Sequence, residues 1–295
     1  MASAVVAELP AGDVKATPTV IAGVTLNYTS IEDGLKALNM TQEDFEAIMA
    51  ADGTRWKHSG CQDGWYLSHN SIRHAMTLLM AAIEKMKTQT DAGKPLEAWQ
   101  VAAFQLVVKD IYHNIHAHHD HEEVIFFPWM ESRVKVPPKM SSDHKTLMAL
   151  LDKTRDIIMG LKAGDAGSNK AAMEELYSTF TEMRALMCEH LEEEELVGLP
   201  LLRKHFTGKE MMDGPEKKIV AEMKPADLAF FLRPMDMPTK RETMTRLGIP
   251  GLIQKLVMLP AVRKDEATVV HAFKELAAGE RIAAAKKKGF LCFAA

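Results

Sequence analysis

The chain has 295 residues, of which 47% are apolar, and it carries a formal net charge of −4 at pH 7. This charge, together with the lack of a basic stripe interleaved with aromatic residues, argues against a nucleic-acid partner. The three cysteines show no CxxC spacing, which argues against a disulfide framework and a thiolate zinc site and favours a reducing compartment. The N-terminal stretch has acids and no arginine, unlike a transit peptide, and no apolar run is long enough to span a bilayer. We therefore expect a cytoplasmic protein.

The predicted elements are helices. Residues 1–59 form a mixed leader that we expect to pack on the helices that follow, with one short helix at 41–51 behind a Thr/Glu capping signal. Turn sequences (TDAGKP, a doubled proline and GLKAGDAGSN) then separate four long helical patterns, which we place at 64–88, 95–131, 139–160 and 170–205. Four helices with short connections predict an all-α fold, an antiparallel up-down four-helix bundle over residues 60–206.

Residues 207–295 differ from the bundle because Pro and Gly recur and break the segment into short helical patterns, with a longer one near 265–288. We interpret them as a helical C-terminal appendage packed on the bundle, and as the surface through which a protein partner would bind. The chain ends in KKKGFLCFAA, where Cys292 has the position of the cysteine in a prenylation box with a basic flank. Because the pattern is short and Phe293 is not the usual aliphatic residue, we favour a frayed tail; only prenylation of Cys292 would bring the protein to a membrane.

One histidine on each long helix falls on the stripe of residues that should face the core. On the second and fourth helices this stripe is apolar except for one histidine and a glutamate one turn later. On the first and third helices it is apolar except for one histidine near the helix start. Neighbouring helices of an up-down bundle run in opposite directions, so these polar side chains should meet in one layer. They are His69, His118, Glu122, His144, His190 and Glu194.

A metal centre explains this convergence better than a set of hydrogen-bonded core residues, which is the plain alternative for any one histidine. Two buried carboxylates without compensation would cost several kcal/mol each or stay protonated. The stretches HHDHEEVIFFP and HLEEEELVGLP align without a gap, and each places Glu four residues after His on one helix face. Imidazole and carboxylate ligands favour iron, with zinc or manganese as alternatives. Because a carboxylate can bridge two ions, we predict a pair of metals.

These residues resemble the hemerythrin-like (HHE cation-binding) domain family over about residues 60–206. The likeness rests on HNSIR, HHDHEEVIFFP, SSDHKTL and HLEEEELVGLP, which contain the six residues named above. It implies a four-helix bundle holding two carboxylate-bridged non-heme iron ions, with the four histidines as terminal ligands and Glu122 and Glu194 as bridging ligands. The stretch EEVIFFPWMESRVK is similar to the hemerythrin-like domains of eukaryotic iron-sensing ubiquitin ligases. The chain has no zinc-binding RING pattern, so ligase activity is not implied.

The chain departs from the oxygen-carrying hemerythrins at two positions. Those proteins have a second histidine four residues after the ligand on the third helix, where this chain has Met148. They have an aspartate five residues after the last histidine, whereas here Glu194 follows at four, with Glu195 one step beyond. Fewer strong ligands leave a more open coordination sphere, so metal binding is implied more firmly than reversible carriage of dioxygen.

The sequence leaves three functions open. The first is a non-heme di-iron protein that binds or senses dioxygen, a related small molecule, or iron itself. The second is a di-iron oxidoreductase acting on peroxide, NO or oxygen. The third is a metal-stabilised interaction protein. Whether the chain is an enzyme stays open among them.

The other histidines of the second helix face other stripes, and we predict solvated or outer positions for His113, His116, His119 and His121. His119 is the main competing register, because Glu123 follows it by four residues. Glu193 and Glu195 are candidates for outer partners of the ligands, with Tyr66 or Tyr112 as a possible donor into the site.

Overall fold

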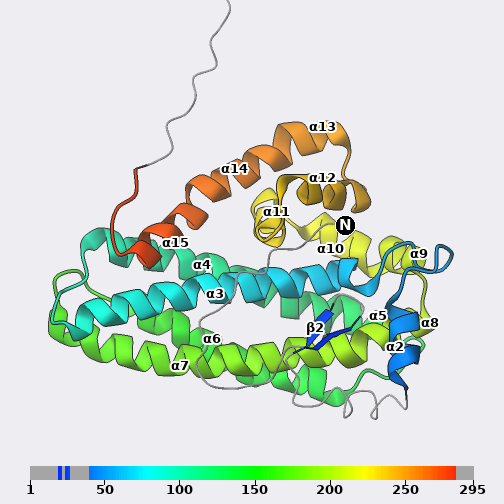
Figure 1. Cartoon of the computed structure of the whole chain (residues 1–295), viewed down its shortest axis with the longest axis horizontal. Coiled ribbons are helices and arrows are strands. Elements are labelled where there is room, and N and C mark those ends of the chain that lie inside the picture. The colour runs from blue at the N-terminus through cyan, green and yellow to red at the C-terminus, as the bar shows by residue number, and fades with distance from the viewer. Residues whose placement is uncertain (1–18, 22–23, 27–39, 284–295) are drawn as a thin grey trace, which may run out of the picture.

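The computed structural model describes residues 19–21, 24–26 and 40–283 (Figure 1). In these residues the chain is helical apart from two three-residue strands, β1 (Thr19–Ile21) and β2 (Val24–Leu26), which pair in antiparallel fashion. The prediction of a helical fold is confirmed, and the two strands were not predicted. None of the described helices combines the length and apolarity that crossing a bilayer requires.

Four long helices lie side by side and are joined by short connections (Figure 1). Two of them are extended by a widened, π-helical turn and a further short helix. The elements are α3 (Gly64–Asp91); α4 (Ala98–His121) with η2 (Glu122–Phe126) and α5 (Phe127–Met130); α6 (Pro138–Gly160); and α7 (Ala166–Glu193) with η3 (Glu194–Gly198) and α8 (Leu199–His205). Helices α3 and α6 each pack against both α4 and α7, so that the four enclose a common core.

The apolar stripes predicted from the sequence form this core. Phe104, Ile111 and Ile115 on α4 and Phe180, Met183 and Met187 on α7 are all fully buried. Each such side chain contributes about 1.5–3 kcal/mol relative to an exposed position. The core is rich in methionine, whose unbranched side chain fills irregular gaps between helices.

Local sequence determines where the long helices begin and end. A reciprocal pair of hydrogen bonds between Glu97 and Gln100 caps the start of α4, and the Asp165 side chain accepts from the Ser168 N–H at the start of α7. Pro138 stands at the first position of α6, where a missing N–H leaves no helical hydrogen bond unmade. After α3, Gly93 adopts a left-handed conformation (φ 73°), which lets the chain reverse into α4.

The segment after α8 folds into short helices, as predicted, and packs on one side of the long helices (Figure 1). Helix α15 packs on α3 and α4, and α11 packs on α3 and on α14. The elements are α9 (Gly208–Met211), η4 (Met212–Glu216), α10 (Lys217–Glu222), α11 (Pro225–Leu232), α12 (Met237–Arg246), α13 (Gly251–Ile253), η5 (Gln254–Met258), α14 (Leu259–Ala267) and α15 (Val269–Ala278).

Two predictions for the chain ends are only partly covered by the described residues. The helix predicted near 265–288 is instead split between α14 and α15 at Thr268, whose backbone leaves the helical region (φ −120°, ψ −81°). Gly279, in a left-handed conformation, then ends α15. Cys292 lies outside the described residues, as does most of the leader.

The described part of the leader is held by one buried arginine. Helix α2 (Gln42–Met49) packs on α8, and Arg203 on α8 is 2% exposed. Its guanidinium donates to the carbonyls of Ile48, Ala50 and His58 and to the carboxylate of Asp63, at 2.8 to 3.0 Å. Arg203 therefore satisfies the backbone of the leader at the point where it enters α3.

Replacing Arg203 with methionine should lower the free energy of unfolding by about 3–5 kcal/mol, because it leaves the Asp63 carboxylate buried without its partner. Denaturant unfolding of the two proteins measures the difference. The matched control is Lys209→Met, since Lys209 is exposed and pairs only with Asp213. Its effect should be much smaller, because an exposed ion pair contributes little to stability, and equal losses from both variants would contradict this role of Arg203.

Candidate metal centre

The two stretches that repeat in the sequence end their helices in the same way. At the end of α4 the Phe127 N–H donates to the carbonyl of Glu122, and at the end of α7 the Leu199 N–H donates to that of Glu194. Both bonds span five residues instead of the four of an α-helix. Pro128 and Pro200 follow directly, and a proline ring does not fit against the carbonyl four residues earlier in an α-helix, which accounts for the widening. Each widened turn begins at a glutamate predicted to be a ligand, and such turns are frequent at functional sites.

The structure brings together all six side chains predicted to bind metal. Five of the residues are buried, with 6% or less of their surface exposed, and the side chain of His118 is 11% exposed. Together with His119, these residues form two groups of potential ligands. In each group the potential ligand atoms lie within 4.8 Å of one another. The His69 group comprises His69, His118, Glu122 and Glu194; the His119 group comprises His119, Glu122, His144 and His190.

The two glutamates lie between the groups. One carboxylate oxygen of Glu122 is 3.1 Å from Nε2 of His118, and the other is 3.5 Å from Nε2 of His144. The two oxygens of Glu194 divide in the same way, at 3.2 Å from Nε2 of His69 and 3.5 Å from Nε2 of His190. Two carboxylates that each face both groups have the arrangement that bridging of two cations requires.

Hydrogen bonds from outside the cluster orient the histidines. The Nδ1 atom of His69 is 2.8 Å from the carboxylate of Glu195, which also accepts two bonds from Arg73, at 2.6 and 3.0 Å. Nδ1 of His144 is 2.7 Å from a carboxylate oxygen of Glu123. These contacts fix the ring so that Nε2 faces the cluster, and they raise the basicity of the imidazole toward a metal.

The Glu122 carboxylate has its own outer donor. The indole N–H of Trp65 donates to Glu122 at 2.6 Å, and the ring of Trp65 packs edge-on to His69 and Phe126. A charge-assisted hydrogen bond of this length holds the carboxylate in one orientation.

Burial and the contacts between the histidines and glutamates of the cluster shift the pKa values of these side chains. Burial lowers the pKa values of His118 and His119, and that of His190 to about 3, so these rings are neutral, the form that binds metal. Burial opposes ionisation of Glu122, yet the nearby imidazoles hold its pKa well below the usual value. Burial and the neighbouring Glu122 raise the pKa of Glu194 well above the ordinary value.

The neighbouring carboxylates favour a proton on His69. Burial acts to lower its pKa, but its contacts with Glu122, Glu194 and Glu195 raise it well above the ordinary value. A cation bound between these residues would take over the role of that proton, since metal binding releases protons from its ligands.

The cluster fits a cation because most of its inward-facing atoms make no hydrogen bond. Within the described residues, seven buried atoms of the cluster make no hydrogen bond: Nε2 of His69 and His118, both ring nitrogens of His119, Oε2 of Glu122 and both carboxylate oxygens of Glu194. Buried polar atoms left unpaired cost free energy, and nitrogen and oxygen donors together suit iron, zinc or manganese. The residues present therefore fit the metal that the sequence predicts.

His119 is the residue that sequence reasoning misplaced. A solvated position for it is wrong, because His119 is 3% exposed and its ring lies 4.3 Å from that of His144, centre to centre. Glu122 lies three residues after His119 and four after His118, so it faces both rings. The sequence signal for His119 is its i, i+3 spacing to Glu122, beside the i, i+4 spacing of His118 to Glu122. From the sequence we considered only the i, i+4 pair of His119 with Glu123.

The other predictions for neighbouring residues had mixed outcomes. His113 is exposed and bonds to Asp227, and His121 lies 3.5 Å from the Glu222 carboxylate. Glu195 is an outer partner of His69, but Glu193 pairs with Lys139 instead. The hydroxyl of Tyr112 donates to Asp152 and not to the cluster.

Replacing His119 with alanine should lower the bound metal, because it removes a donor from the His119 group. Metal content per chain after loading with ferrous iron and desalting measures the loss. The control is His113→Ala on the same helix, which should keep the parental metal content because His113 bonds only to Asp227. Equal loss in both variants would contradict this assignment.

Glu195→Gln should weaken metal binding by about 10- to 100-fold, because the neutral amide no longer supports the His69 imidazole. Competition with a chelator of known affinity measures the change. Glu193→Gln, two residues away on the same turn and directed at Lys139, is the matched control. An unchanged affinity in Glu195→Gln would show that His69 needs no outer carboxylate.

The part of the chain that contains this cluster matches a known protein family. The chain matches the family model of the hemerythrin HHE cation binding domain over residues 62–202, a range that contains all the residues of both groups. Neither the curated proteins nor the solved structures that were searched contain a match to the chain. The resemblance to the hemerythrin HHE cation-binding domain family is thus confirmed over residues 62–202.

Proposed function

We propose that the protein is a non-heme di-iron protein that binds or senses dioxygen or a related small molecule. The observation that carries this proposal is the pair of buried His/Glu groups that share Glu122, in which most of the inward-facing atoms make no hydrogen bond. The family whose model matches residues 62–202 supports cation binding at this place. Iron, when bound, would supply a redox-active Lewis acid at which dioxygen, NO or peroxide can bind.

The proposal includes the arrangement of the helices. We propose that α3, α4, α6 and α7, with their extensions, form an antiparallel up-down four-helix bundle over residues 60–206. The leader before residue 60 and the appendage from residue 207 then pack on it. Short connections, and the packing of α3 and α6 each on both α4 and α7, support this organisation.

In the proposed centre the residues divide into two roles. His69 and His118 would hold one ion, and His119, His144 and His190 the other, while Glu122 and Glu194 would bridge the two. The positions of the carboxylate oxygens between the groups support the bridging role. This set has one histidine more than the sequence predicted, namely His119. It partly compensates for Met148, which stands where the oxygen-carrying hemerythrins have a further histidine ligand.

The surrounding side chains would keep bulk water from the centre. Ile72, Ile115, Leu147 and Met187 each lie three or four residues from a histidine of the cluster and are at most 2% exposed. On the opposite side, the ring of Phe127 stacks on His144. A dry, apolar surrounding strengthens electrostatic interactions inside the site and limits access to small molecules.

A di-iron oxidoreductase is the second candidate. It is favoured by a cavity that reaches His118 and Glu122, because a binder of diatomic molecules needs no such space. Turnover of peroxide, NO or oxygen under reductant would select it over simple binding. A metal-stabilised interaction protein is the third, and metal-dependent folding without any redox response would select that.

Metal content, measured with the optical spectrum before and after anaerobic reduction and again in air, tests the proposal. We expect about two irons per chain and an iron absorption that bleaches on reduction and changes again when oxygen is admitted. Replacing both His118 and Glu122 with alanine should remove most of the metal, since Glu122 belongs to both groups. A folded protein that binds one zinc or no metal would overturn the di-iron proposal.

A further inference from the structure

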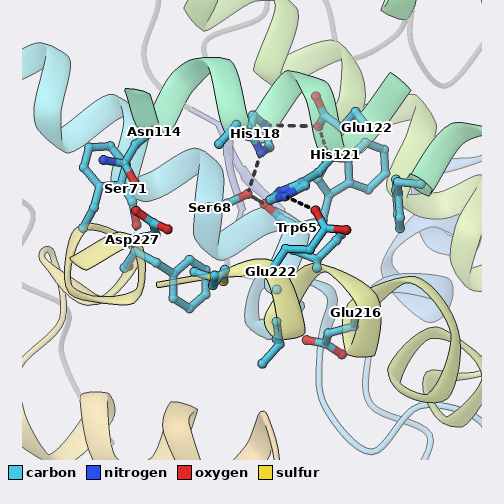
Figure 2. A pocket seen from close by; sticks show the side chains of 18 of the residues that line it. Trp65, Ser68, Ser71, Asn114, His118, His121, Glu122, Glu216, Glu222 and Asp227 are labelled. Carbon is cyan, nitrogen blue, oxygen red and sulfur yellow. Dashed lines mark hydrogen bonds and ion pairs between the residues drawn. The ribbon is translucent and has the colours of Figure 1, made fainter. Parts of the chain in front are cut away.

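A cavity of about 280 Å³ lies beside the cluster, between α3, α4 and the appendage. In Figure 2, Trp65 and Ser68 of α3 and His118 of α4 form one side of it, and Glu216 and Glu222 of the appendage form the other. The appendage thus closes a space that opens toward the proposed metal centre.

The cavity reaches the centre through His118, whose Nδ1 atom is poorly satisfied. The corresponding Nδ1 atoms of His69 and His144 are 2.8 and 2.7 Å from carboxylates. Nδ1 of His118 instead lies 3.4 Å from the hydroxyl of Ser68, which donates to the carbonyl of Trp65 at 2.6 Å. Both His118 and Ser68 line the cavity, so a ligand with an oxygen atom there could accept the short hydrogen bond that this nitrogen lacks.

The remaining wall selects for an apolar molecule without negative charge. It is formed largely by hydrophobic side chains, among them Ile72, Phe126, Val220, Phe230, Phe231 and Leu247. The charged residues on it are mostly acidic, with Glu216, Glu222 and Asp227 against Lys224. With three carboxyl groups against one ammonium group, this side of the cavity favours a neutral ligand over an anion.

The volume indicates the size of the ligand. A buried apolar cavity of about 150 Å³ holds one benzene ring. At about 280 Å³ the space beside His118 is nearly twice as large, and two fused six-membered rings match it.

We propose that this cavity binds an uncharged, largely apolar organic molecule of about ten carbon atoms, with a hydroxyl group held against His118 and Ser68. A hydrogen bond to the outer nitrogen of a metal-binding imidazole tunes the metal, so the ligand would act as an organic co-substrate or effector of the centre. That last role rests on the proposed function, whereas binding to the cavity does not.

Equilibrium dialysis of the iron-loaded full chain with 2-naphthol tests the site. We expect saturable binding of one 2-naphthol per chain, and at least about tenfold weaker binding of 2-naphthoate, which has the same rings but a negative charge. Val220→Trp fills the cavity from the appendage and should weaken 2-naphthol binding about tenfold or more. Val257→Trp, at a partly exposed valine outside the cavity, is the matched control and should bind as the parent does.

Ala117→Phe fills the same cavity from α4 and replaces Val220→Trp if that variant does not fold. Binding that does not saturate, that is equal in the cavity-filled and control variants, or that does not distinguish naphthol from naphthoate would overturn the inference. In the iron-loaded protein, 2-naphthol should also shift the iron absorption, and binding without a shift would overturn its placement against His118.

Metal content in the same samples separates this inference from the proposed function. Saturable, cavity-dependent binding of 2-naphthol to a protein without iron would support the cavity and overturn the di-iron proposal. Iron at the expected content without 2-naphthol binding would support the di-iron proposal and overturn the inference about the cavity.

Discussion

Glu122 and Glu194 are buried against the same two imidazoles, those of His69 and His144. Two carboxylates in an apolar interior would cost several kcal/mol each unless positive charge is brought to them. Around them the chain supplies a protonated His69, the indole N–H of Trp65 and, further out, the Arg73–Glu195 pair. The structure near the centre positions and orients these compensating groups.

The helix ends and the appendage follow from that placement. The widened turns at Glu122 and Glu194 let each helix present a carboxylate inward and then continue past a proline into α5 and α8. Helix α8 in turn carries Arg203, which holds the described end of the leader. The appendage covers the side of α3 and α4 next to the cluster and leaves a cavity there instead of a close-packed contact.

Much of this was predictable because long amphipathic helices have a strong periodic signal. The stripes on the second and fourth helices identified fully buried core positions, and the stripes on all four helices together placed the six predicted polar residues in one layer. Their role as ligands stays a prediction, which the geometry supports. His119 was missed because helix periodicity assigns one face to each residue, whereas Glu122 can face both His118 and His119.

The appendage was less predictable for a physical reason. Its helices are short, so each contains too few turns to define a stripe, and their positions depend on contacts with α3 and α4 instead of on local sequence. Neither the cavity nor its acidic wall could be inferred, because both arise from side chains far apart in the chain. The break at Thr268 likewise has no strong local signal, since proline and glycine are both absent there.

The repeated stretches give the molecule an internal symmetry that the appendage breaks. His118 and His190 occupy equivalent places in HHDHEEVIFFP and HLEEEELVGLP, each four residues before the glutamate at which a widened turn begins. Yet the outer nitrogen of His118 faces Ser68 and the cavity, whereas that of His190 lies 4.0 Å from the Asp143 carboxylate. Two sites built from one pattern are thereby made inequivalent, with one half of the cluster beside a cavity and the other half enclosed by the protein.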